Sequence, residues 1–129
     1  MKKILWISAL SLTVSLTALN AQTPIEAARN TPQITQKLFR GYLSGHDTHT
    51  VISRLRHTQE MLKHAIHDKK LNNLLSYLDL CINDLRQAVT RPATDANIRH
   101  INDLLGAISE GNRFIIHALS HQKVVVAIR

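Results

Sequence analysis

The chain has few of the residues that would support a disulfide scaffold or a nucleic-acid surface. Its 129 residues include one cysteine, Cys81, two phenylalanines, two tyrosines and one tryptophan. A single thiol cannot close a disulfide within the chain, so the fold must rest on packing, and we expect Cys81 to be a buried free thiol. Because aromatic rings are few and the lysines and arginines are scattered, nucleic-acid binding is not expected.

Motifs of the common hydrolytic and phosphate-binding sites are also missing. The sequence contains no G-x-S-x-G, no H-E-x-x-H and no glycine-rich phosphate loop. Its nine acidic residues are spread along the chain. A hydrolytic enzyme needs a nucleophile beside a base, or two carboxylates in one cleft. We therefore expect that the protein is not an enzyme.

Only one long apolar run is present, and it lies at the start of the chain. Lys2 and Lys3 precede the run from Ile4 to Leu19, and Ala21 offers a cleavage site before Gln22. The run is short for a membrane span and is diluted by serine and threonine, so it predicts a secretory signal peptide over residues 1–21. Residues 22–129 would then form one periplasmic domain, not inserted in the membrane, with 14 basic and 9 acidic residues.

Apolar residues recur at the three- and four-residue spacing of amphipathic helices, and no segment alternates at period two. Thr23-Pro24-Ile25-Glu26 has the form of a helix start, and Thr31-Pro32 repeats it. The expected helices cover residues 32–43, 47–67, 71–90 and 94–121; Val124–Ile128 either extends the last helix or lies over its neighbours. Short connections favour antiparallel neighbours. The prediction is an all-α, antiparallel up-down-up-down four-helix bundle that is monomeric.

The last of these helices has the most distinctive pattern. Thr94 and Asp95 can cap its first turn. Its apolar stripe is interrupted by one polar residue, Asn112; the stripe consists of Ile98, Ile101, Leu105, Ile108, Ile115 and Leu119.

Histidine is the main chemical group that remains. On the 47–67 helix, five histidines project away from the apolar stripe: His46, His49, His57, His64 and His67. A solvated face is the expected interpretation. The alternative is divalent metal binding, because the spacing of His64 and His67, and that of His117 and His121, lets two imidazoles reach one ion.

The C-terminal region resembles a known family. Arg113-Phe114-Ile115-Ile116-His117 forms an R-x-x-x-H string in the last helix, and His121-Gln122-Lys123 follows. With an exported chain of about one hundred residues and four helices, this resembles the soluble periplasmic cytochromes of the cytochrome b562 family. The resemblance implies a non-covalent haem b, with His117 as an axial ligand of the iron, Arg113 beside the haem and His121 as the alternative ligand. It also implies electron transfer with a periplasmic redox protein.

The second axial ligand is unknown. The family uses a methionine in the first helix, but residues 31–35 contain none, and Met61 is the only methionine after the signal segment. By strict periodicity His117 and His121 also fall outside the apolar stripe. The alternative is therefore a haem-free relative that acts as a periplasmic binding or metal-binding protein, with two surface histidines.

Overall fold

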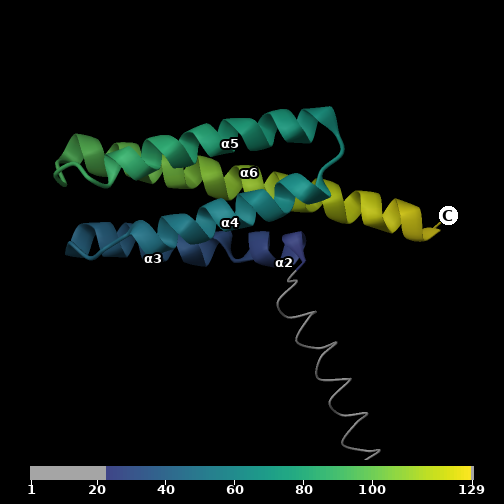
Figure 1. The fold of residues 1–129 in the computed structure, drawn as a ribbon, viewed down its shortest axis with the longest axis horizontal. Helices are drawn as coiled ribbons and strands as arrows, with labels where there is room; N and C mark the ends of the chain where they lie inside the picture. The colour runs from purple at the N-terminus through teal and green to yellow at the C-terminus, as the bar shows by residue number, and fades with distance from the viewer. Residues whose placement is uncertain (1–22, 129) are drawn as a thin grey trace, which may run out of the picture.

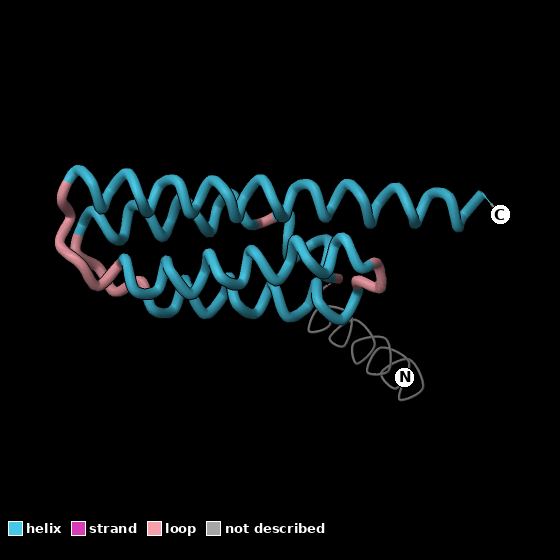
Figure 2. The backbone as a smooth tube through the Cα atoms, turned by 90° about the horizontal axis from the view of Figure 1, so that it is seen from above, coloured by secondary structure: helices cyan, strands magenta, loops and turns pink. Residues whose placement is uncertain are grey.

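The computed structural model describes the backbone of residues 23–128 and the side chains of residues 23–121. The predicted signal peptide, residues 1–21, lies outside this part. The described chain is all-helical, as predicted, and contains no strand (Figures 1 and 2). Its five helices are α2 (Pro24–Arg29), α3 (Thr31–Ser44), α4 (His49–Ala65), α5 (Lys69–Ala88) and α6 (Asp95–Ile128).

A break at Asn30 separates α2 from α3. Thr23 caps α2 by accepting a hydrogen bond from the Glu26 amide at 3.2 Å. One turn after α2 ends, Pro32 lies in the first turn of α3, where it has no N–H to continue the ladder of the preceding helix. The repeated threonine-proline start in the sequence thus produces two consecutive helices.

The ends of the other helices follow local chemistry. Gly45 ends α3 with φ of 76°, a left-handed conformation that glycine adopts at little cost. Asp68 caps α5 by accepting from the Leu71 amide at 3.0 Å. The sequence suggests Asp47 as the N-cap of α4, but the cap residue is Thr48, one position later. Asp47 Oδ1 accepts a hydrogen bond from the His49 amide at 2.9 Å. The helix also ends at Ala65, two residues early, because Ile66 is extended and buried.

Each helix packs its apolar stripe against neighbours on two sides. α4 lies between α5 and the α2–α3 pair, and α6 contacts α5, α3 and α2. α6 also runs past the ends of the other helices toward its C-terminus (Figures 1 and 2). Within the described residues, none of the helices combines the length and the apolarity needed to cross a membrane.

The core divides into two apolar clusters. The larger one surrounds Leu38, Leu55 and Leu85, and the smaller one surrounds Leu62, Leu78 and Ile115. Cys81 is a free, buried thiol in the larger cluster, as expected.

Candidate functional site

The residues predicted for a haem site all lie on the surface of α6. Arg113, His117 and His121 are exposed. Arg113 Nη1 lies 4.0 Å from Glu110 Oε1, but with side chains 81% and 74% exposed this pair contributes little stability. The inward positions of this turn are taken by Asn112 and Ile115, which are both fully buried.

An axial haem ligand has to present an imidazole nitrogen to iron held among apolar side chains. Exposed imidazoles at His117 and His121 do not fit a haem enclosed by these helices. The second axial ligand stays unknown, and Met61, the only methionine among the described residues, is partly buried on α4. Haem ligation by His117 therefore stays a prediction from the sequence string.

The histidines of the α4 region are exposed, as predicted: His46, His49, His57, His64 and His67. Among the residues that the structure describes, no group of three or more histidine, cysteine, aspartate or glutamate side chains is placed to hold a metal ion. Pairs such as His64 with His67 lack a third protein ligand of these types there.

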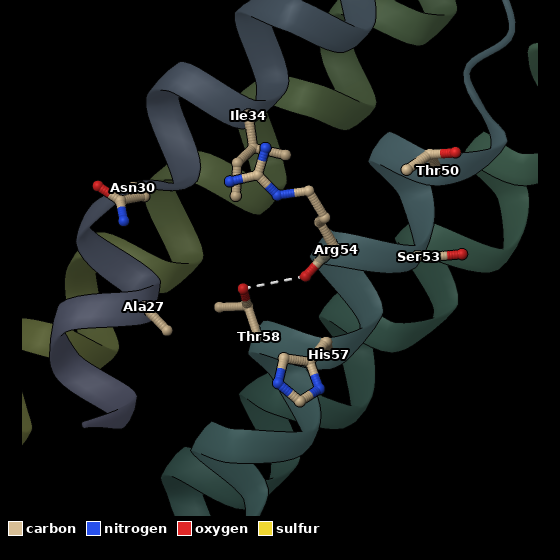
Figure 3. Close-up of a pocket in the computed structure, with 8 residues that line it drawn as sticks. All are labelled: Ala27, Asn30, Ile34, Thr50, Ser53, Arg54, His57 and Thr58. Atoms are coloured by element: carbon tan, nitrogen blue, oxygen red, sulfur yellow. Dashed lines mark hydrogen bonds between the residues drawn. The ribbon is translucent and has the colours of Figure 1, made fainter. Parts of the chain in front are cut away.

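A cleft of about 290 Å³ opens where the chain breaks between α2 and α3 (Figure 3). One wall comes from Ala27, Asn30 and Ile34, and α4 supplies the other with Thr50, Ser53, Arg54, His57 and Thr58. The break explains the cleft, because an uninterrupted helix would carry its side chains across this position. Ala27 is too small to fill the gap.

Two cationic or ionisable side chains face this cleft without a carboxylate partner. Figure 3 shows Arg54 extending from α4 toward α3, with the His57 ring one turn further along. Within the described part of the chain, neither forms an ion pair. The backbone carbonyl of Arg54 is occupied, because Thr58 Oγ1 donates to it at 3.1 Å. The cleft thus combines an unpaired guanidinium, an imidazole and hydroxyl groups with the apolar Ala27 and Ile34.

A buried polar layer adjoins this cleft. Asn112 Nδ2 donates to Thr31 Oγ1 at 2.9 Å and to Gln59 Oε1 at 2.8 Å, and Thr31 Oγ1 donates to the Ala28 carbonyl at 2.6 Å. Thr31 and Gln59 directly follow two residues that line the cleft. Gln59 Nε2 and Asn112 Oδ1 are buried and have no hydrogen-bond partner. Such unpaired groups cost stability, so this layer is unusual for a purely structural core.

Two other clefts lie between neighbouring helices. One of about 390 Å³ lies between α3 and α6, and is lined by Thr35, Gln36, Phe39, Arg40, Asn102, Leu105, Gly106 and Ser109. The other, of about 210 Å³, lies between α4 and α5. In the latter, Arg56 already donates to Asn83, and burial raises the pKa of the Asp79 carboxyl.

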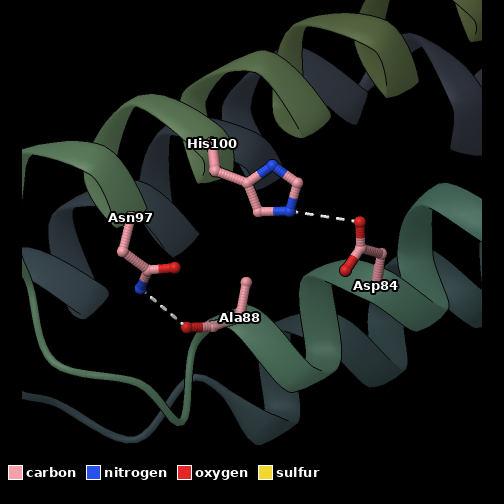
Figure 4. Close-up of polar contacts among 4 residues, drawn as sticks. All are labelled: Asp84, Ala88, Asn97 and His100. Atoms are coloured by element: carbon pink, nitrogen blue, oxygen red, sulfur yellow. Dashed lines mark hydrogen bonds and ion pairs between the residues drawn. The ribbon is translucent and has the colours of Figure 1, made fainter.

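Polar contacts between α5 and α6 form a further candidate (Figure 4). His100 Nε2 lies 3.1 Å from Asp84 Oδ2, with both side chains more than two-fifths exposed, and Asn97 Nδ2 donates to the Ala88 carbonyl at 2.9 Å. No serine, threonine or cysteine hydroxyl or thiol forms a described hydrogen bond with His100. This pair therefore links two helices and offers no activated nucleophile.

The sequence pattern places His57 only among several solvent-facing histidines, and it does not single out Arg54 or Gln59. Two signals pointed to the region: the repeated threonine-proline start, and the polar interruption of the α6 stripe at Asn112. Neither signal indicates that these segments meet at one place.

Comparison with family models, with curated proteins and with solved structures gives no match.

Proposed function

We propose that this chain is a haem-free periplasmic binding protein that holds a small ligand in the cleft between the α2–α3 pair and α4. The protein is exported by its N-terminal segment, works as a monomer and catalyses no reaction. It keeps the architecture of the cytochrome b562 family without the electron-transfer role.

The architecture in this proposal is an antiparallel up-down-up-down four-helix bundle, with α2 and α3 together acting as the first helix. The pattern of neighbours supports it: α4 lies between the α2–α3 pair and α5, and α6 lies between α5 and the α2–α3 pair. In such a ring each helix contacts two others and faces the fourth across the core.

The observation that carries the proposal is the break at Asn30. It opens a cleft beside Arg54 and His57 and next to the buried layer in which Gln59 Nε2 and Asn112 Oδ1 are unpaired. A continuous first helix with an apolar residue at each core position would be more stable. Concave sites with a few polar groups in an apolar lining are typical of small-ligand binding.

Two measurements test this function. Hemin is added to the purified protein, and the reduced visible spectrum is recorded. We expect no sharp α and β bands, because the exposed imidazoles of His117 and His121 cannot enclose a haem. Sharp bands that disappear in His117→Ala would contradict the proposal and support electron transfer.

The second measurement uses ¹H–¹⁵N NMR with a mixture of small anionic, cationic and neutral compounds. We expect shift changes confined to the cleft, at Asn30, Ile34, Arg54 and His57. If no compound in the mixture moves these signals at millimolar concentration, the binding function is wrong.

A further inference from the structure

We infer that the ligand of the α2–α3/α4 cleft is a short aliphatic carboxylate, bound through Arg54 and His57 at its charged end and against Ala27 and Ile34 along its tail. This inference rests on the proposed binding function and names the ligand class.

The charge of the ligand follows from the side chains that face the cleft. Arg54 is always protonated, and His57 offers a ring N–H whichever of its neutral tautomers is present. No aspartate or glutamate is among the lining residues. A guanidinium matches the two oxygens of a carboxylate and forms strong charge-assisted hydrogen bonds with it. A cationic ligand would meet repulsion from Arg54, and a neutral one would forgo these bonds.

The apolar part of the ligand follows from the opposite wall. The exposed lining of the cleft is mainly apolar, and Ala27 and Ile34, which are 6% and 4% exposed, bring methyl groups and no polar side-chain atoms to it. A tail of methylene groups placed against them would leave water, which favours binding for each group buried. Inorganic phosphate would pair with Arg54 but would leave this wall without a contact.

The size of the ligand follows from the volume of the cleft. About 290 Å³ is at the lower end of the range for small-molecule sites. A chain of a few carbons fits such a space.

Butyrate is the probe for the test, with butyramide, acetate and inorganic phosphate as comparators. NMR titration of the intact protein should show butyrate shifting the signals of Ala27, Asn30, Ile34 and Arg54. Acetate should bind several-fold more weakly because it lacks most of the tail. Butyramide has nearly the same shape without the charge and should give no shift at the same concentration.

Arg54→Gln should weaken butyrate binding about tenfold or more, because charge-assisted hydrogen bonds are lost. Arg86→Gln is the matched control: Arg86 is an exposed arginine on α5 outside the cleft, so its loss should leave the affinity unchanged. Thr50→Leu should also abolish binding by filling the cleft from its exposed α4 wall. Circular dichroism confirms that each variant is folded, and Thr50→Leu provides an independent result if Arg54→Gln unfolds.

The inference is overturned if butyramide or phosphate binds as tightly as butyrate, or if Arg54→Gln and Arg86→Gln have the same affinity. If cleft signals move with another compound of the mixture but not with butyrate, the ligand class is wrong while the binding function stands. If no compound shifts the signals of the cleft residues, both the ligand class and the binding function are wrong.

Discussion

Two asparagines of α6, Asn97 and Asn112, are both buried, but their polar groups find hydrogen-bond partners to different degrees. Asn97 Nδ2 donates to Tyr42 Oη at 2.5 Å and to the Ala88 carbonyl, and Tyr42 Oη in turn donates to the Arg91 carbonyl at 2.9 Å. Asn112 also bonds two partners from distant helices, Thr31 and Gln59, yet its own Oδ1 and Gln59 Nε2 stay unpaired.

The difference indicates two roles: the hydrogen bonds of Asn97 stabilise the fold, whereas the unpaired groups of the Asn112 layer lower its stability. The Asn97 cluster joins α3 to the end of α5 and to the connection between α5 and α6: Asn97 donates to the Ala88 carbonyl, which also accepts from the Arg91 amide, and Tyr42 donates to the Arg91 carbonyl. The Asn112 layer lies between the two apolar clusters and beside the break at Asn30. Natural cores rarely keep unpaired amides, and those that persist call for an explanation such as a neighbouring ligand site.

The largest expected effect comes from removing each polar cluster in turn. Tyr42→Phe combined with Asn97→Leu should lower the free energy of unfolding by about 2–4 kcal/mol, because three hydrogen bonds are lost and the Arg91 carbonyl loses the Tyr42 hydroxyl as its donor. Gln59→Leu combined with Asn112→Leu should change it by no more than about 1 kcal/mol, since unpaired atoms are removed with the bonds. Thr31 keeps its bond to the Ala28 carbonyl in that variant. Urea denaturation, monitored by circular dichroism, measures the free energy of unfolding of the two double variants. Equal losses of stability would show that the two clusters have the same role.

The glycines of α6 sharpen the comparison. Gly111 lies beside Asn112, and a Cβ there would stand 2.6 Å from both δ-methyl carbons of the buried Leu78. Gly111→Ala should therefore destabilise the protein by about 1–2 kcal/mol, since the core has to shift. A Cβ at Gly106 meets nothing within 4 Å. Gly106→Ala is the control and should stabilise the helix by about 0.5–1 kcal/mol. The midpoint of thermal unfolding measures both variants. A higher midpoint for Gly111→Ala would show that this layer is loosely packed.

The smallest effect concerns a charged group, Asp79 of α5, which lines the cleft between α4 and α5. Burial raises the pKa of its carboxyl, Glu60 adds to the rise, and Lys63 and Arg56 oppose it. With a pKa above that of the unfolded chain, the carboxylate costs stability at neutral pH, and the cost disappears as the pH falls through the raised value.

Asp79→Asn should thus raise the urea midpoint slightly at pH 7 and leave it unchanged near pH 3, below the ordinary aspartate value. A midpoint that drops at pH 7 would mean that the attraction of Lys63 and Arg56 outweighs burial.

The sequence was a good guide to the helices and a poor one to the cleft. Apolar periodicity identified the buried stripe of α5, including Leu71, Leu78 and Leu85, and the exposure of the α4 histidines. Helix ends were less accurate: α4 stops two residues before His67, because tertiary packing draws Ile66 out of the helix and into the core. Whether His117 binds a haem stays a prediction, since the string Arg113-x-x-x-His117 sets a spacing and no burial.

What the sequence by itself determined is local: which segments form helices, where Thr23, Asp68 and Gly45 begin or end them, and which face of each is apolar. These properties depend on residues within four positions of one another. Only the tertiary structure decided that Asn97 is satisfied while Asn112 is not, and that Arg54 and His57 face a cleft at Asn30. Those outcomes join residues as far apart as Thr31 and Asn112, 81 positions along the chain. They depend on how the helices pack around one core, which no local pattern specifies.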